Sequence, residues 1–215
     1  MKSSADACDR PFDAVLCDID GVIRFYDTDV VCQLEKRVGL LAGTTAAIGF
    51  APENDLPLLL GQITREQWAH SIVQGLVPAV ARAEAQMLAK AFTEAESRID
   101  DAVVRLLRRV RSGCPVVLVS NATVWLDEDL ELLGLRDLAD DVVNSSLVGV
   151  AKPDRRIYEI AAERAGVPTD RCLFVDDREE NTTAAAELGM TTVLYRDAAG
   201  LEEALAPVLR SSLLT

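Results

Sequence analysis

The segment Val15-Leu16-Cys17-Asp18-Ile19-Asp20-Gly21-Val22 decides the fold, because a short apolar run ends abruptly in two carboxylates and a glycine. A nearly continuous apolar run of this length is typical of a strand that is buried on both faces of a parallel sheet. The first such run spans residues 14–17. Further runs of this kind lie at 115–120, 172–175 and 191–195, and a weaker candidate lies at 142–143.

Helical patterns occupy the intervals between these strand candidates. They lie at 102–111, 125–133, 155–165 and 180–188. Strands that alternate with helices of about this length form parallel sheets with helices on both faces. The sequence therefore predicts an α/β fold with a doubly wound parallel sheet.

One long segment breaks this alternation. Residues 24–97 contain no convincing strand, and their helical patterns lie at 29–38, 44–48, 64–74 and 78–92. Thr64 precedes Gln67 by three residues, which is the spacing of a capping box at a helix start. We therefore predict two domains: an α/β core formed by 10–23 and 98–215, and a helical domain at 24–97.

The composition is that of a globular protein without a membrane segment. The chain has 215 residues, of which 49% are hydrophobic, enough for one core and a small accessory domain. No apolar stretch approaches the roughly 18 residues that a membrane span requires, and the polar N-terminus lacks the pattern of a signal peptide. The five cysteines are odd in number and lack CxxC spacing, which favours free thiols in a reducing compartment. We therefore predict a cytoplasmic protein.

The charge balance disfavours a nucleic-acid partner. The net charge is −13, with 35 acidic against 22 basic residues, whereas nucleic-acid binding needs a concentrated positive face. We interpret the basic cluster at 105–111 as the solvated face of a helix. His70 is the only histidine, which disfavours a histidine-rich metal site or a Ser-His-Asp triad. We interpret it as a structural residue of its predicted helix rather than as a substrate contact.

Polar side chains follow the predicted strands at the points where the strands end. In an open parallel sheet, ligands bind beyond the carboxyl ends of the strands. Carboxylates gathered there raise each other's pKa, and a divalent cation together with a phosphoryl group would balance them. The candidate residues are Asp18, Asp20, Ser120, Asn121, Lys152, Asp176 and Asp177.

Four motifs in this set, in order and spacing, resemble those of the haloacid dehalogenase superfamily. They are Asp18-x-Asp20-Gly21-Val22, Val119-Ser120-Asn121, Lys152-Pro153 and Phe174-Val175-Asp176-Asp177. The resemblance covers the whole chain, because the predicted helical insertion falls where that superfamily places a small helical cap. It implies a phosphatase-type hydrolase with Mg²⁺ as its cofactor.

The resemblance assigns a role to each motif. Asp18 would attack phosphorus and form an aspartyl-phosphate, which water then hydrolyses. Asp20 would protonate the leaving oxygen and later deprotonate that water, while its backbone carbonyl binds the metal. Ser120 and the amide of Asn121 would hold phosphoryl oxygens, and Lys152 would neutralise charge on the nucleophile and the transferred group.

The metal would be held by Asp18, Asp20, Asp176 and Asp177. We expect Asp177 to bind it directly and Asp176 through a metal-bound water, although two adjacent carboxylates leave this order open. Asn181 would orient Lys152 or a metal-bound water, or only stabilise the start of its helix. For Arg24, contact with an anionic substrate and a surface charge at the hinge remain equally open.

Asp20 also bears on the type of reaction. Dehalogenases of the superfamily lack an acid at this position, because a halide leaves without protonation. The implied function is therefore magnesium-dependent hydrolysis of a small phosphorylated metabolite, without a nucleic-acid or membrane partner. A phosphotransferase or sugar-phosphate mutase is the alternative, and a dehalogenase or a non-catalytic module that binds a phosphorylated ligand ranks below both. The substrate and the oligomeric state stay open.

Overall fold

The computed structural model describes residues 10–211, which form two compact units. The first contains the residues up to Phe25 and from Ile99 onward, and we call it the α/β unit. The second, Tyr26–Arg98, is the helical unit. The chain passes between them through two short strands, β2 (Arg24–Tyr26) and β3 (Ser97–Ile99), which form a two-stranded sheet of their own.

A five-stranded parallel sheet forms the centre of the α/β unit. Its strand order is β5-β4-β1-β6-β7, so the first strand of the chain lies in the middle and the crossovers run to both sides. The predicted doubly wound parallel sheet is thus confirmed. The strands are β1 (Ala14–Cys17), β4 (Val116–Ser120), β5 (Asp141–Asn144), β6 (Cys172–Asp176) and β7 (Thr191–Leu194).

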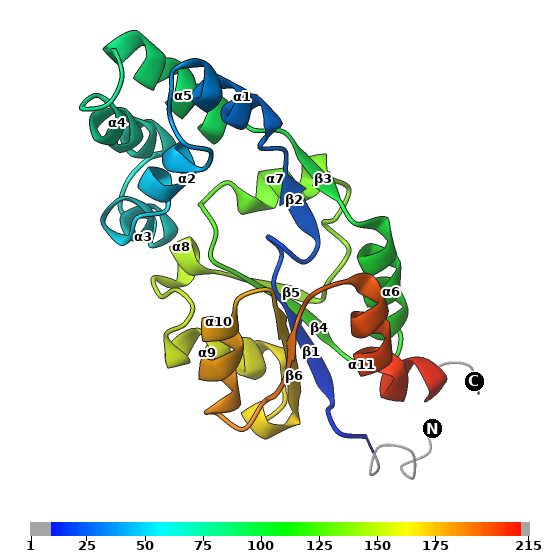
Figure 1. Ribbon diagram of the computed structural model, residues 1–215. Coiled ribbons are helices and arrows are strands. Elements are labelled where there is room, and N and C mark those ends of the chain that lie inside the picture. The colour runs from blue at the N-terminus through cyan, green and yellow to red at the C-terminus, as the bar shows by residue number, and fades with distance from the viewer. Residues whose placement is uncertain (1–9, 212–215) are drawn as a thin grey trace. The chain divides into compact units, whose positions relative to one another are not determined.

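Helices cover both faces of this sheet (Figure 1). Successive side chains of a strand point to opposite faces, so each of the buried strands contributes to two cores. The helices of this unit are α6 (Asp101–Arg111), α7 (Leu126–Leu132), α8 (Ser145–Val148), α9 (Arg155–Ala165), α10 (Glu179–Ala186) and α11 (Ala198–Ser211), with a 3-10 turn at Thr169–Arg171. Val15 and Cys17 pack on the side of α6, α7 and α11, whereas Ala14 and Leu16 pack on the side of α9 and α10.

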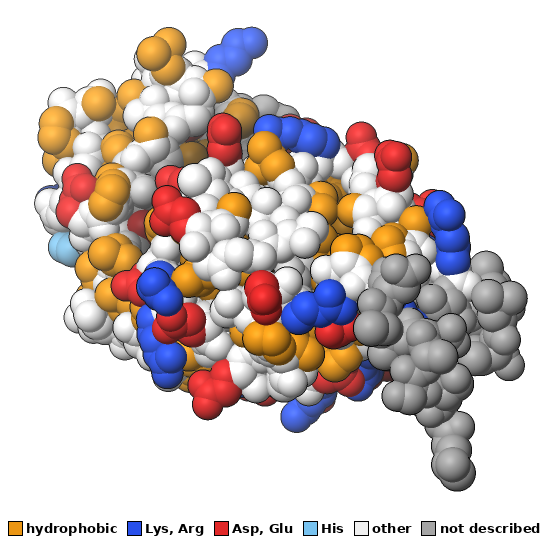
Figure 2. Space-filling model, turned by 90° about the horizontal axis from the view of Figure 1, so that it is seen from below, with side chains coloured by type: hydrophobic (Ala, Val, Ile, Leu, Met, Phe, Trp, Pro, Cys, Tyr) orange, Lys and Arg blue, Asp and Glu red, His pale blue; other side chains and the backbone are white. Residues whose placement is uncertain are grey.

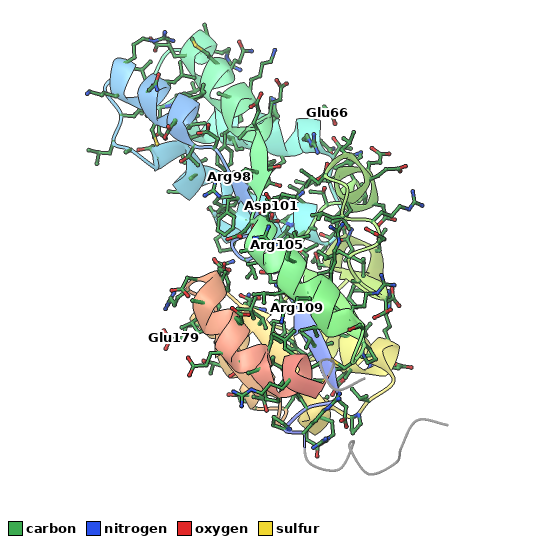
Figure 3. The ribbon with its side chains drawn as sticks, turned by 90° about the vertical axis from the view of Figure 1, so that its right-hand side faces the viewer. Glu66, Arg98, Asp101, Arg105, Arg109 and Glu179 are labelled. Atoms are coloured by element: carbon green, nitrogen blue, oxygen red, sulfur yellow. The ribbon has the colours of Figure 1, made fainter. Side chains whose placement is uncertain are left out.

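The basic cluster at 105–111 lies on α6, where Asp101, Arg105 and Arg109 follow one another on successive turns (Figure 3). Arg109 pairs with Glu202 at 3.4 Å, and both side chains are more than half exposed. Acidic and basic side chains are interspersed on the face shown in Figure 2. The arginines of α6 are exposed, and Arg108, Arg109 and Arg111 each pair with a carboxylate. The predicted solvated helix face is thus confirmed.

Five helices make up the helical unit: α1 (Asp29–Arg37), α2 (Thr44–Gly49), α3 (Pro52–Leu59), α4 (Arg65–Leu76) and α5 (Arg82–Thr93). Its core lies between α4 and α5, where Ile72 and Leu76 pack against Leu88. The predicted capping box at Thr64 and Gln67 is confirmed. His70 is exposed on α4 beside Gln74.

Three details differ from the expectations for segment 24–97. The helix predicted at 78–92 begins only at Arg82, because Pro78 lies in the turn in which Ala79 and Val80 donate to the carbonyl of Leu76. The strands β2 and β3 were not predicted, since three residues of mixed polarity carry no alternation signal. Helix α3 was also missed, because it contains Pro57, which disfavours a helix interior.

Two further findings concern membrane segments and cysteines in the described part of the chain. Among residues 10–211, no helix is long and apolar enough to cross a membrane. Cys17, Cys32, Cys114 and Cys172 carry free thiols, and Cys8 lies outside the described residues.

Glu35 is a fully buried carboxylate that holds the start of α2. Its two oxygens accept hydrogen bonds from the backbone N–H groups of Gly43 and Thr45, at 2.7 and 2.6 Å. The first N–H groups of a helix have no partner within the helix, so the side chain of Glu35 satisfies the N–H of Thr45, which burial would otherwise leave unpaired.

We expect Glu35→Ala to lower the free energy of unfolding by roughly 1–3 kcal/mol, because the buried N–H of Thr45 loses its acceptor. Glu35→Gln keeps one acceptor oxygen and should lose less. Urea unfolding measures both variants, with Glu163→Ala on the exposed side of α9 as the control. Equal stability of Glu35→Ala and the control would contradict this role.

Candidate active site

Lys152 lies between two carboxylates at the carboxyl edge of the sheet. Its ammonium nitrogen is 2.8 Å from Asp18 Oδ1 and 2.7 Å from Asp176 Oδ2. Asp18 directly follows β1, Asp176 is the last residue of β6, and Lys152 precedes α9. All three side chains are buried, so the pairs are shielded from water and from salt. The sheet thus unites three charges that are far apart in the sequence.

The burial of this cluster changes its protonation behaviour. Burial raises the pKa of Asp18 to about 7, the ammonium of Lys152 opposes this shift, and the charge of Asp176 adds to it. Burial alone would lower the pKa of Lys152, but the charges of Asp18 and Asp176 outweigh it and raise that pKa above its ordinary value. Lys152 therefore stays protonated at neutral pH, while the pKa of Asp18 lies well above its ordinary value.

Asp176 is held by several donors besides Lys152. The side-chain amide of Asn181 donates to both of its oxygens, at 3.0 and 3.1 Å, and the backbone N–H of Arg178 donates to Oδ1 at 2.9 Å. Tyr158 donates to the backbone carbonyl of Asn181 at 3.1 Å and so steadies the start of α10. Asn181 thus orients Asp176, a partner that the sequence did not suggest.

Asp177 and Ser120 differ from Asp176 in having buried oxygens without a partner. Within residues 10–211, neither Asp177 Oδ1 nor Ser120 Oγ makes a hydrogen bond. Burial and then the charge of Asp176 raise the pKa of Asp177. Buried polar atoms nearly always have partners, so two unpaired atoms at one sheet edge indicate that a ligand supplies them.

The carboxylates of Asp18, Asp176 and Asp177 form one acidic cluster that suits a cation. Each offers an oxygen, and these oxygens lie within 4.8 Å of one another. Carboxylate oxygens are the ligands of hard divalent ions such as Mg²⁺. The unpaired Oδ1 of Asp177 and the uncompensated negative charge of the cluster both fit such an ion.

Asn121 fixes the backbone of Lys152. Its side-chain oxygen accepts from the Lys152 N–H at 2.7 Å, and its side-chain nitrogen donates to the Lys152 carbonyl at 2.9 Å. Ser145 supports the same loop, because its hydroxyl accepts from the N–H of Ala122 at 3.0 Å. The side chain of Asn121 is therefore committed to positioning Lys152, which leaves only its backbone amide for a ligand.

Asp20 lies apart from the three clustered carboxylates. Arg24 Nε is 2.6 Å from Asp20 Oδ1, and Arg24 Nη2 is 3.0 Å from Asp20 Oδ2. The third guanidinium nitrogen, Nη1, is 3.0 Å from Asp129 Oδ2 on α7. Arg24 is only 4% exposed, so the interpretation of this residue as a surface charge is wrong.

The comparisons with known proteins agree with this geometry. A family model described as a haloacid dehalogenase-like hydrolase matches residues 12–189, which include every motif of the site. The chain belongs to this family of hydrolases. It is 29% identical over 196 residues to Phosphatase MT3486 of Mycobacterium tuberculosis, covering 84% of this chain and 86% of that protein.

One further relative of this haloacid dehalogenase-like hydrolase is named as a dehalogenase, and one solved structure shares its fold. An (S)-2-haloacid dehalogenase of Pseudomonas sp. (strain YL) is 32% identical over 97 residues, 45% of this chain and 40% of the relative. The HAD family enzyme bt-2542 of Bacteroides thetaiotaomicron, solved in complex with magnesium and inorganic phosphate, has the same fold. Its TM-score is 0.64 and its identity 22%, over 86% of this chain and 94% of that chain.

Gly21 lets this hydrolase place Asp177 against the first motif. Gly21 has a φ of +83°, and a Cβ built on it would lie 2.4 Å from Asp177 Oδ2. Gly134 offers a matched position, with a φ of +67° and nothing within 4 Å of a built Cβ. A substitution at either glycine therefore strains the backbone, but only a substitution at Gly21 also clashes with a neighbouring side chain.

We expect Gly21→Ala to displace Asp177 and to destabilise the protein more than Gly134→Ala does. Both variants should lose roughly 1–2 kcal/mol of unfolding free energy from the left-handed backbone conformation. Gly21→Ala should lose at least about 1 kcal/mol more from overpacking. Urea unfolding measures the difference, and equal losses would show that Asp177 does not constrain this position.

The raised pKa of Asp18 predicts how metal-free stability depends on pH. Its carboxyl binds a proton more tightly in the folded state, so its stabilising contribution is present below the ordinary pKa of 3.8 and is lost as pH rises toward about 7. We therefore expect Asp18→Asn to reduce the fall in melting temperature between pH 5 and pH 7.5, measured in a chelator. The exposed Asp127→Asn is the control. A pH dependence of Asp18→Asn like that of the unchanged protein would contradict the raised pKa.

Proposed function

We propose that this hydrolase cleaves small phosphomonoesters in a Mg²⁺-dependent reaction with Asp18 as the nucleophile. One observation carries the proposal: the buried contact of Lys152 with Asp18 and Asp176, beside the unpaired oxygens of Ser120 and Asp177. An ammonium, a hydroxyl and a cation-binding carboxylate around one nucleophile suit a transferred phosphoryl group. The relative named as a phosphatase, which matches over most of both chains, supports the same chemistry.

In the first half of the proposed reaction, a carboxylate oxygen of Asp18 forms a bond to phosphorus. The bond from phosphorus to the leaving oxygen breaks, and Asp20 gives that oxygen its proton. Lys152, Ser120 and the backbone amide of Asn121 would hold the phosphoryl oxygens. In the second half, Asp20 takes a proton from water, whose oxygen displaces the aspartyl group and releases inorganic phosphate.

Mg²⁺ would be held by Asp18, by Asp177 and by the backbone carbonyl of Asp20. Asp176 is already bound by Lys152 and Asn181, so it suits a role through a metal-bound water better than direct ligation. When bound, the ion would supply positive charge that Lys152 alone cannot provide to three clustered carboxylates. The helical unit would serve as a cap domain that selects the substrate.

We expect the unchanged protein to release phosphate from 4-nitrophenyl phosphate with Mg²⁺ and to lose this activity in a chelator. Asp18→Asn should lower kcat by roughly 10³ or more, because the amide cannot form the intermediate. The exposed Asp127→Asn should be unaffected. Undiminished turnover in Asp18→Asn would overturn the mechanism. If the wild-type protein is active, phosphate release from a panel of phosphorylated metabolites identifies its substrate.

The match to a dehalogenase raises a second candidate, the hydrolysis of a 2-haloacid. Asp20 disfavours it, because a halide leaves without protonation and needs no acid at that position. Chloride release from 2-chloropropionate, without phosphate release from any phosphomonoester, would favour this candidate. A mutase would instead convert a sugar phosphate to its isomer without releasing phosphate.

A further inference from the structure

Arg24 bridges two carboxylates, of which Asp20 takes part in the proposed reaction and Asp129 does not. All three of its guanidinium nitrogens donate to carboxylate oxygens, two to Asp20 and one to Asp129. We propose that Arg24 is a positioning residue, anchored by Asp129, that holds the Asp20 carboxylate in place for proton transfer. This inference rests on the function proposed above and adds two residues outside the four motifs.

The backbone already brings Arg24 and Asp20 together. The carbonyl of Ile19 accepts from the N–H of Arg24 at 2.8 Å, and the N–H of Gly21 donates to the carbonyl of Arg24 at 2.9 Å. Asp20 and Arg24 therefore lie at the two ends of one tight turn that follows β1. The side-chain contact of Arg24 with Asp20 bridges the same turn in addition to these backbone hydrogen bonds. The position of the Asp20 carboxylate is therefore fixed relative to the end of β1.

Asp129 holds Arg24 from the other side. It lies on α7, whose Leu126 and Leu130 are buried in the core of the α/β unit, so it is a fixed anchor. Arg24 is 4% exposed, whereas the side chains of Asp20 and Asp129 are 35% and 32% exposed. A buried guanidinium needs charged partners, and this one lies between two carboxylates that still reach water.

The pairing leaves Asp20 able to transfer protons. A carboxylate has about four lone-pair sites, and the fork of Arg24 occupies one on each oxygen. The remaining sites can accept the proton of water or carry the proton that goes to the leaving oxygen. A planar, bidentate contact fixes the plane of the carboxylate, and the ammonium of a lysine cannot reproduce it. The contact therefore restricts the orientation of the Asp20 carboxylate and leaves lone pairs on it free for proton transfer.

The same contacts argue against Arg24 as a substrate ligand. Each of its nitrogens is committed to a carboxylate of the α/β unit, at 3.0 Å or less. Binding an anionic substrate would require the guanidinium to leave Asp20 or Asp129. Of the two interpretations that the sequence left open for Arg24, the substrate contact is therefore replaced in this proposal by an indirect role through Asp20.

The test compares two substrates that differ in their need for an acid. The 4-nitrophenolate leaving group departs with little protonation, whereas the ethoxide leaving group of ethyl phosphate must be protonated as it leaves. We therefore use the ratio of two kcat/KM values, that for ethyl phosphate divided by that for 4-nitrophenyl phosphate. This ratio reports proton donation by Asp20. We expect Arg24→Lys and Asp129→Asn to lower this ratio by about tenfold or more. Asp20→Asn should lower it further, and Arg109→Lys, an exposed change on α6, should leave it unchanged.

The outcomes separate the two proposals. If Arg24→Lys does not fold, Asp129→Asn carries the test, because it keeps Arg24 and removes only its anchor. An equal loss for both substrates, or a rise for ethyl phosphate, would overturn the positioning role and leave the phosphatase proposal intact. If the wild-type protein releases phosphate from neither substrate, the proposed function is overturned, and the role of Arg24 is overturned with it.

Discussion

The buried contact of Lys152 with Asp18 and Asp176 is the interaction on which the rest of the site depends. Two carboxylates buried side by side cannot both stay charged without a cation, because each raises the free energy of the other's charged form. The other polar groups at this sheet edge keep that contact in place. Asn121 holds the backbone of Lys152, and Asn181 holds Asp176. The sheet supplies the frame, since β1 and β6 are neighbours.

The site is nevertheless incomplete in charge and in hydrogen bonds. One ammonium faces three carboxylates, and Asp177 Oδ1 and Ser120 Oγ are buried without a partner in the described part of the chain. A cation and an anion together would satisfy both deficits. Under the proposed function, the local positive charge of Lys152, and not the net charge of the protein, would attract the phosphoryl group of a substrate.

Much of the α/β unit could be predicted from local patterns. The buried strands are continuous apolar runs, and the helices between them carry clear periodicity, so β1 and α9 were predicted at their observed bounds. Other elements were missed. The strands β2 and β3 have three residues each and α3 contains Pro57, so their formation depends on tertiary packing that local patterns do not report. Helix α11 was also not recognised, although its buried residues Leu201, Leu205 and Val208 recur at helical spacing.

The sequence by itself determined which chemical groups stand at the strand ends, because strand periodicity and four short motifs suffice to place Asp18, Ser120, Lys152 and Asp177 at one edge of a parallel sheet. Only the tertiary structure decided how these groups are paired. Asn121 turns its side chain to Lys152, Asn181 to Asp176, and Arg24 to Asp20 and Asp129. The physical reason is that a hydrogen bond between segments far apart in the chain depends on distance and direction in space, and neither is encoded in local residue order.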